Sequence, residues 1–470
     1  MRGTSAVVLA VICTLLPFAA QFYGDRSGGW LMVDFRAYYC AALAQRLGED
    51  PYLADSLQEC ESSTPAPYYH APRTVTVPAP YPPYVLAFYY PLTFLPFGIA
   101  AILWWLLLGA SLVLAASALA RIAAVPFLVA WAALVLSAGL TTFMAGNVMP
   151  LALLALVVAA LFLHRGWNRA AATLMAVALI EPQVTLPAVI ALFIAVPNIR
   201  PRLALIVALL GGISILGGAG LTLEYLTEVI PAHALSEVSR DNQYSISTVL
   251  TALGVPDIAA VIVGSISYML ALVIGVFVAL RLARRYEEPA LVLLVPPAFS
   301  LLGGSFVHTV EIAAAVPAAL VLFRLTRSQS QSFFPALLLL AVPWMLATSA
   351  AMFLAPLFPA AYLTYTLLRR NGVLAVMAAA VSCILILGLF ALYAAPHAPA
   401  IPHVHLHPPI DPDLAEASWR QFVLGNVTNR PVMWLLRLPT WIGLALFAVC
   451  ATQLATRKFF RWDPRRAAPA

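Results

Sequence analysis

The feature that most constrains this chain is the recurrence of long apolar segments along its whole length. One helical crossing of a bilayer takes about 20 apolar residues. Segments of this kind lie near residues 6–22, 84–120, 124–143, 146–164, 168–196, 203–222, 257–281, 289–304, 307–325, 333–368, 372–394 and 433–456. The sequence therefore predicts an all-α polytopic membrane protein with about 12–14 transmembrane helices.

The composition excludes a large soluble domain. Hydrophobic residues make up 62% of the 470 residues and charged residues only 10%, whereas soluble domains average about 25% charged residues. We interpret the first apolar segment, 6–22, as an uncleaved span and not as a signal peptide. No small-residue cleavage site stands out before Gln21, and many further spans follow.

The net charge of +6 does not indicate a nucleic-acid partner, because the basic residues lie in short turns and in the C-terminal tail. The stretches "RLARRYEE", "LLRRNG" and "TRKFFRWDPRR" are typical of loops that face the cytoplasm. Three longer polar segments then fall on the other side of the membrane, at residues 23–83, 223–256 and 395–431. Most of the acidic residues lie on that outer side.

Two apolar segments carry internal breaks. Segment 84–120 is too long for one span and contains "LPFG", so we expect its first part to be re-entrant. Segment 168–196 is interrupted by "EPQ", which predicts two short helices that meet at Glu181 on the outer side. An ionisable group among so many apolar residues is costly and is a functional candidate. At a helix break on the outer side, Glu181 could also simply pair with an arginine.

The first polar loop predicts two short helices. Phe35, Tyr38 and Leu47 recur at helical spacing after Asp34, a good N-cap, and Gly48 is a good C-terminal stop. Asp50 followed by proline predicts the start of a second helix. We expect both helices to lie on the outer membrane surface.

The same loop holds two of the five cysteines, Cys40 and Cys60. They could form a disulfide in an oxidising compartment. Pairing also requires a suitable Cα separation, so the sequence leaves it open.

Several stretches together resemble a known family. "VDFRAYYCAALAQRLGEDPY", "YPPYVLAFYYPLTFLPFGIAAILWW", "AGNVMPLALLAL", "DNQYSISTVLTALG" and "SLLGGSFVHTVEIAAAVP" are similar, in this order, to the bacterial polyprenyl-phosphate-dependent mannosyltransferases. That family has a GT-C type membrane fold and includes the phosphatidylinositol mannoside mannosyltransferases of mycobacteria. The resemblance covers residues 1–325. Glu181 stands where the family usually carries a lysine, so it could bind a sugar hydroxyl or mark a chain that has lost the usual donor site. Asn147 belongs to a reduced "GQxN" motif, and His308 is single where two histidines are expected.

The resemblance implies an inverting transfer of a sugar, with mannose expected, from a polyprenyl phosphate to a lipid or cell-envelope glycan. The enzyme would lie in the inner membrane of a bacterium, among membrane lipids, with its active site facing the periplasm or the cell exterior. Residues 1–325 would form the catalytic transmembrane module. Residues 326–470 would form a variable transmembrane module with the outer loop 395–431 and a basic cytoplasmic tail.

Asp34 is the candidate general base, because it would stand at the outer membrane face, where the acceptor and the lipid donor meet. It could equally serve only as a helix cap. The leaving phosphate needs cations or hydrogen-bond donors, for which Arg36, Arg240 and His308 are available. His308 could instead be a packing residue, and Arg240 could belong to a solvated loop. The substrate-binding candidates are Arg36, Tyr38, Tyr81, Asn147, Glu181, Gln183, Arg240, Asn242, Gln243 and His308.

No cofactor or metal is expected. The segment "HVHLHPPIDPD" at residues 403–413 has alternating histidines, but ligands from one flexible segment define no geometry. Two other functions remain open. A transporter or flippase would carry charged residues deep in several spans and two matched halves. A non-catalytic member of the family would bind a polyprenyl lipid without transferring its sugar.

Overall fold

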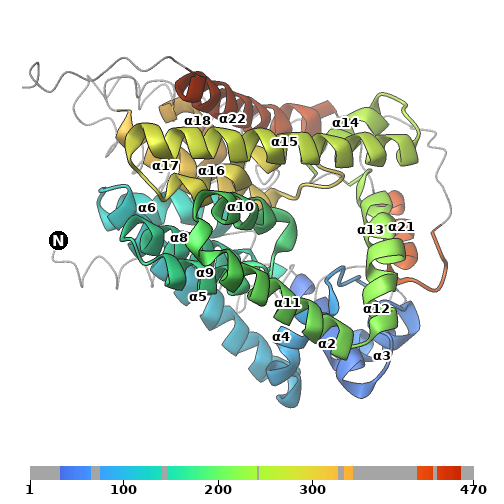
Figure 1. Ribbon diagram of the computed structural model, residues 1–470. Helices are drawn as coiled ribbons and strands as arrows, with labels where there is room; N and C mark the ends of the chain where they lie inside the picture. The colour runs from blue at the N-terminus through green and yellow to red at the C-terminus, as the bar shows by residue number, and fades with distance from the viewer. Residues whose placement is uncertain are drawn as a thin grey trace, which may run out of the picture.

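The computed structural model describes residues 32–64, 75–139, 145–240, 243–326, 333–341, 410–426 and 431–456. Every regular element in these ranges is a helix (Figure 1). The only sheet-like pairings in the same ranges are isolated bridges, from Leu53 to Leu414 and from Gln243 to His308. The expected first span, 6–22, and the histidines of residues 403–407 lie outside the described residues.

Four helices of the described ranges are long and apolar enough to cross a membrane, which confirms the all-α polytopic fold. They are α5 (Phe97–Ile122), α11 (Arg200–Leu216) with the preceding turn η3 (Pro197–Ile199), α15 (Asp257–Tyr286) and α22 (Pro431–Thr456). The expected number of spans stays a prediction. Shorter apolar helices are α6 (Phe127–Leu134) with the π-turn η2 (Val135–Gly139), α8 (Met149–His164), α10 (Pro182–Ala195) and α16 (Leu291–Ser300).

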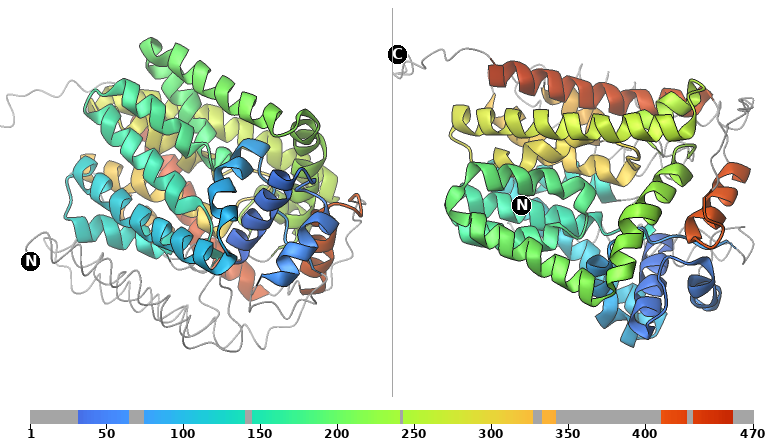
Figure 2. Two further views of the ribbon diagram at one scale, coloured as in Figure 1. Left: turned by 90° about the horizontal axis from the view of Figure 1, so that it is seen from below. Right: turned by 45° about the vertical axis from the view of Figure 1, so that its right-hand side comes forward.

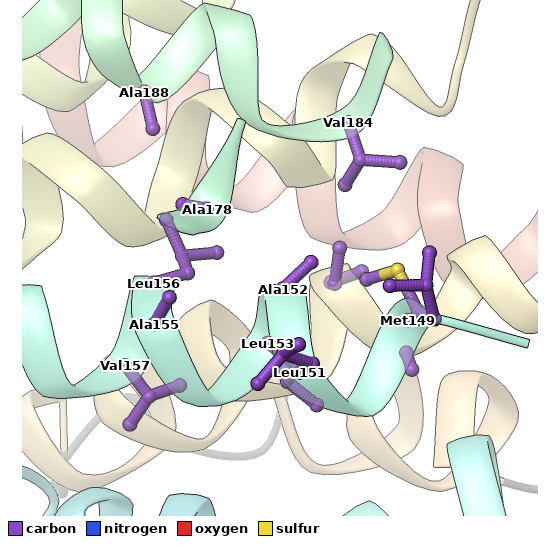
Figure 3. Close-up of a cluster of buried hydrophobic side chains, with 14 of the residues drawn as sticks. Met149, Leu151, Ala152, Leu153, Ala155, Leu156, Val157, Ala178, Val184 and Ala188 are labelled. Atoms are coloured by element: carbon purple, nitrogen blue, oxygen red, sulfur yellow. The ribbon is translucent and has the colours of Figure 1, made fainter. Parts of the chain in front are cut away.

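Helix α8 lies at the centre of the bundle. Figure 3 shows Met149 and Leu156 of α8 facing Val184 of α10 and Ala178 of α9 (Asn168–Ala178). Small side chains such as Ala152 let the helix backbones approach closely, which is the usual basis of helix packing in a membrane. This packing fixes the position of the N-terminal end of α8, which reaches the candidate site.

Both expected breaks in the long apolar segments are confirmed. The first segment forms α4 (Pro83–Tyr89) and the 3₁₀ turn η1 (Tyr90–Phe94) before α5 begins. In the second, α9 ends before Glu181 and α10 begins at Pro182. Proline fixes its own φ and lacks an N–H, so it suits the first position of a helix and interrupts the one before it.

The first expected helix is α2 (Val33–Leu47), and Gly48 ends it as expected. Gly48 has a φ of 83°, and its N–H donates to the carbonyls of Ala44 and Gln45. The expected capping role of Asp34 is wrong. Met32 occupies the N-cap position and no side chain caps the helix. Asp34 lies in the first turn instead, where its carboxylate accepts a hydrogen bond from Asn147.

The second expected helix, α3, starts later than predicted, at Ala54–Ser63. Asp50 does not start it, because its Oδ1 accepts the N–H of Tyr52 and so closes a tight turn through Pro51. Cys40 of α2 and Cys60 of α3 form a disulfide with a Cα separation of 5.6 Å. Most of α2 is buried against α3, α4 and η1. It is therefore a packed element and not a helix lying freely on a surface.

The two ends of the bundle differ in charge. At one end, Arg202 donates to the carbonyl of Arg169, Arg324 to that of Ala124, and Arg285 to that of Leu454. These contacts connect α17 (Ala315–Leu325) to the connection after α5, and α15 to α22. At the opposite end, Figures 1 and 2 place α2, α3, α13 and α21 together.

The elements of this second end carry the candidate site. They include α12 (Ala219–Glu224), the π-turn η4 (Tyr225–Val229), α13 (Ile230–Glu237), α14 (Ile246–Ala252), the 3₁₀ turn η5 (Thr309–Ala314) and α21 (Ala415–Asn426). Arg420 of α21 pairs with Asp257 at the start of α15, with 3.2 Å between Nη2 and Oδ2. The remaining described helix, α18 (Phe333–Ala341), packs along α22.

Candidate active site

Asp34 is held by the residues that precede α8. Asn147 Nδ2 donates to Asp34 Oδ2 over 2.9 Å, and Asn147 Oδ1 accepts the N–H of Met149, which fixes the amide. Gly146 has a φ of 72°, and a Cβ there would come within 2.8 Å of Phe35 Cβ. Glycine at this position therefore allows α2 to lie directly against the start of α8, with Asp34 facing Asn147.

A row of tyrosines continues from Asp34. Asn147 Nδ2 also lies 3.3 Å from the hydroxyl of Tyr38, which lies 3.5 Å from the hydroxyl of Tyr81. Tyr81 donates to Glu181 Oε2 over 2.7 Å. These contacts link α2 to the break between α9 and α10.

Glu181 is buried but hydrogen-bonded. In addition to Tyr81, Gln183 Nε2 donates to Glu181 Oε1 over 2.9 Å. The same Gln183 nitrogen donates to Glu311 Oε1 over 2.8 Å. The sequence left open whether Glu181 pairs with an arginine. Among the described residues, its partners are the neutral donors Tyr81 and Gln183. The helix break at Pro182 brings Glu181 and Gln183 to the same side of the site.

His308 links two buried carboxylates. Its Nδ1 lies 3.0 Å from Glu311 Oε1 and its Nε2 lies 3.1 Å from Glu237 Oε2. Glu311 belongs to η5, directly after His308, and Glu237 ends α13. The bridge between Gln243 and His308 places the loop after α13 beside the loop before η5. His308 is thus fixed from both sides and is more than a packing residue.

Glu237 is the most heavily hydrogen-bonded side chain described in the site. It is fully buried, and both carboxylate oxygens lie 3.1 Å from Arg240 Nη1. Gln243 Nε2 donates to it over 2.8 Å and Trp419 Nε1 over 2.7 Å, in addition to His308. A buried carboxylate is stable only when donors and cations satisfy it in this way. Glu237 therefore positions the cations Arg240 and His308.

The charges of these groups follow from their neighbours. Burial opposes a charge on Glu237, but Arg240 and His308 hold its pKa well below its usual range. Burial also opposes a charge on His308, but hydrogen bonds to Glu237 and Glu311 raise its pKa to about 10. At neutral pH the site therefore contains an anionic Glu237 between a protonated His308 and Arg240.

Asp34 has a different balance. Burial raises its pKa, while the hydrogen bond from Asn147 and the charges of Arg240 and His308 lower it in part. Asp34 as a residue is partly exposed, whereas Glu237 is fully buried. An accessible carboxylate with a raised pKa is well suited to accept a proton.

The candidates predicted from the sequence fall into three groups. One hydrogen-bonded network contains Asp34, Tyr38, Tyr81, Asn147, Glu181, Gln183, Arg240, Gln243 and His308. Arg36 lies apart from it and pairs with Glu61, with 3.4 Å between Nη2 and Oε2. Glu61 also accepts the N–H of Val77, so Arg36 helps to hold α2 against α3 and the following segment. Asn242 lies outside the described residues.

Sequence reasoning missed Glu237, Glu311 and Trp419. The two acids lie three residues from Arg240 and from His308, so their spacing was a usable signal. Trp419 gave no such signal, because α21 lies beyond the part of the chain that carries the resemblance. Arg437 of α22 also reaches the site, where its Nη2 donates to the carbonyl of Arg240 over 3.2 Å.

One group of side chains has the composition of a metal site. Ligand atoms of His233, Glu237 and His308 all lie within 4.8 Å of one another. The Glu237 carboxylate, however, already accepts hydrogen bonds from Arg240 and Trp419 as well as from His308. The described geometry fits an ion-paired carboxylate better than a free metal ligand.

The chain was also compared with known proteins. The model of Glycosyltransferase family 87 matches residues 80–303, slightly less than half of the chain. No curated protein and no solved structure matches it. The matched range contains Asn147, Glu181 and Glu237, whereas Asp34 precedes it and His308 follows it. Together with the apolar helices, the family match supports a membrane glycosyltransferase.

Proposed function

We propose that this protein transfers a sugar from a polyprenyl phosphate to a hydroxyl group of a lipid or cell-envelope glycan. Mannose is the sugar that the sequence resemblance favours. The reaction takes place at the end of the bundle that holds Asp34, with inversion at the anomeric carbon. The match to Glycosyltransferase family 87 supports the class of reaction, and the donor and acceptor are part of the proposal.

One observation carries this function. One hydrogen-bonded network joins Asp34, through Asn147, Tyr38, Tyr81, Glu181, Gln183 and Glu311, to His308, and the charges of Arg240 and His308 lower the pKa of Asp34. The site thus combines a carboxylate that can accept a proton with two cations that can hold a phosphate. A sugar transfer from a lipid phosphate needs these two capacities side by side.

The step follows from this arrangement. The Asp34 carboxylate removes the proton of the acceptor hydroxyl as its oxygen attacks the anomeric carbon of the donor sugar. The bond from that carbon to the phosphate oxygen breaks, and its electron pair leaves with the polyprenyl phosphate. The phosphate gains negative charge in the transition state, which Arg240 and His308 stabilise.

The polar groups that connect Asp34 to His308 in the network provide contacts for the sugar. Glu181, Gln183 and Tyr81 present carboxylate, amide and hydroxyl groups beside one another. Such groups bind sugar hydroxyls by accepting and donating hydrogen bonds. We assign to Glu181 the role of binding a sugar hydroxyl. It stands where the family that the sequence resembles usually carries a lysine.

Two features favour an extracytoplasmic site. The disulfide between Cys40 and Cys60 joins α2, the helix that carries Asp34, to α3, and disulfides persist in oxidising compartments. The arginine contacts of Arg202, Arg285 and Arg324 lie at the other end of the bundle. Arginine-rich ends face the cytoplasm in most multi-span proteins.

The test is sugar transfer by the purified protein in lipid. It would be supplied with a panel of labelled polyprenyl-phosphate sugars and with membrane extract as a source of acceptors. We expect label to move from one donor into a new product. Asp34→Asn should lower this rate by about 100-fold or more, because it removes the base while keeping the shape of the side chain.

The matched control is Asp55→Asn, an exposed aspartate of α3 in the same loop, which should keep full activity. Transfer that survives in Asp34→Asn at the wild-type rate would show that Asp34 is not the base. A folded wild-type protein that transfers no sugar from any donor would refute the proposed activity and favour a lipid-binding or flippase function.

A further inference from the structure

A cavity lies between α5, α8 and α9. Its volume is about 400 Å³, and Leu114, Leu154, Val158 and Leu174 are among its wall residues. A cavity of this size is large enough for part of a small ligand. None of its lining residues belongs to the hydrogen-bonded network around Asp34. We refer to it as the α5–α8–α9 groove.

The shape of the groove fits a chain that lies parallel to the helices. Its lining extends along α8 from Leu151 to Arg165, the residue that follows the helix, which corresponds to roughly 21 Å at the rise of an α-helix. One leaflet contributes about 15 Å of hydrocarbon, half of the bilayer core. Leu114 and Val177 on its rim are 55% and 39% exposed, so the groove opens toward the surface that would face lipid.

The groove is apolar along its walls and basic at one end. Arg121 lies in the last turn of α5, and Arg165 directly follows α8. Both arginines line the groove and both are exposed. Neither forms an ion pair with a carboxylate in the described part of the chain. Two cations at the mouth of an apolar channel match a ligand with an anionic head and a hydrocarbon tail.

We propose that the α5–α8–α9 groove binds one anionic glycerophospholipid from the leaflet at the arginine-rich end of the bundle. Its phosphate lies between the guanidinium groups of Arg121 and Arg165, and one acyl chain lies along α8. A free phosphate would leave the apolar walls unfilled. A zwitterionic lipid would bring an ammonium group toward the two arginines. The site does not depend on the proposed sugar transfer.

Trp167 provides a local reporter for this site. Its ring lies 5.7 Å from the guanidinium carbon of Arg165 and is 55% exposed. The full-length protein would be reconstituted in phosphatidylcholine vesicles that contain brominated phosphatidylglycerol or brominated phosphatidylcholine. Brominated chains quench tryptophan fluorescence at close range. Subtraction of the signal of Trp167→Phe isolates the contribution of Trp167.

We expect half-maximal quenching of Trp167 at a phosphatidylglycerol fraction about 25-fold lower than for phosphatidylcholine, since each of the two arginines contributes roughly fivefold. In the double variant Arg121→Gln/Arg165→Gln, phosphatidylglycerol and phosphatidylcholine should quench Trp167 at about the same fraction. The control is Arg284→Gln, an exposed arginine at the end of α15 that does not line the groove. It should keep the wild-type preference.

Val158→Phe tests the groove separately from its charges, because it fills the wall, keeps both arginines and adds no tryptophan. We expect it to abolish the preferential quenching. A preference that survives in Val158→Phe would show that the lipid is held at the surface by charge alone, which refutes a site in the groove. Equal quenching by the two lipids in the wild-type protein would overturn the proposal, and so would a preference that survives in the double arginine variant.

Discussion

At the residue scale, Glu237 controls the charge of the candidate site. Its carboxylate holds Arg240 and His308, and it raises the pKa of His308 together with Glu311. Sugar transfer as proposed needs His308 protonated and Asp34 ionised. Activity should therefore fall at low pH, as Asp34 takes up a proton at its raised pKa. It should persist until about pH 10, where His308 loses its proton.

Glu237→Gln should shift the alkaline side of this profile. The substitution keeps the shape of the side chain but removes its charge, so the pKa of His308 should fall toward its ordinary value of 6.5. On the alkaline side, the variant should lose activity at a pH about one unit or more below that of the wild type. The pH dependence of kcat in the wild-type and variant proteins measures this shift.

The matched control for Glu237→Gln is Glu416→Gln, a change to another buried carboxylate at the same end of the molecule. It should leave the fall of kcat at alkaline pH unchanged. If folded Glu237→Gln lost activity at the same alkaline pH as the wild type, Glu237 would not set the charge of His308. Stability gives a second readout. The pair of His308 with Glu237 stabilises the wild type fully below about pH 6.5, and this contribution is lost as the pH rises through about 10.

At the element scale, the disulfide determines how firmly α2 presents Asp34. It joins Cys40 of α2 to Cys60 of α3, 20 positions later. Closing a loop of this length restricts the unfolded chain by about 3 kcal/mol. Cys40→Ser/Cys60→Ser should therefore lower the free energy of unfolding by about that amount. Thermal unfolding in detergent measures the effect, and sugar transfer should decrease as α2 loosens.

Cys450→Ser is the control for the disulfide variant, because Cys450 is a free cysteine on α22. It should unfold at the wild-type temperature. Reducing agent should destabilise the wild type and leave the double serine variant unaffected. Equal stability of the wild type and the double variant would contradict a supporting role for the disulfide.

Local elements were largely predictable from the sequence. Prolines located the breaks before α5 and before α10, and Gly48 located the end of α2, because these residues restrict the backbone directly. The role of Asp34 at the start of α2 was not predictable in the same way. A capping aspartate bonds within its own helix, whereas this carboxylate bonds to Asn147, 113 positions away. The contact with a residue distant in the sequence, and not the local helix pattern, therefore determines the role of Asp34.

At the scale of the whole molecule, the site depends on segments that no local pattern connects. The bond from Trp419 to Glu237 spans 182 positions. Arg437 reaches Arg240 across 197 positions. The sequence divided the chain near residue 325 because its resemblance to the family ended there. The described helices α21 and α22 nevertheless contribute to the site, so a chain that lacks them would leave Glu237 and Arg240 without these contacts.

The unequal ends of the bundle also predict its orientation. The contacts of Arg202, Arg285 and Arg324 lie at one end and Asp34 at the other, so the positive-inside rule predicts that Asp34 faces away from the cytoplasm. Single cysteines can be placed at Leu253, which is 76% exposed near the site, and at the exposed Arg169 at the arginine-rich end. The background for both is a protein without its free cysteines.

In intact cells, an impermeant maleimide should label Leu253→Cys within minutes and leave Arg169→Cys unlabelled until the membrane is permeabilised. Both labels should appear equally in detergent, which controls for reactivity. The reverse pattern would place Asp34 and its cations in the cytoplasm. The disulfide between Cys40 and Cys60 would then face a reducing compartment, where such bonds rarely persist. The labelling therefore tests the orientation of the site independently of sugar transfer.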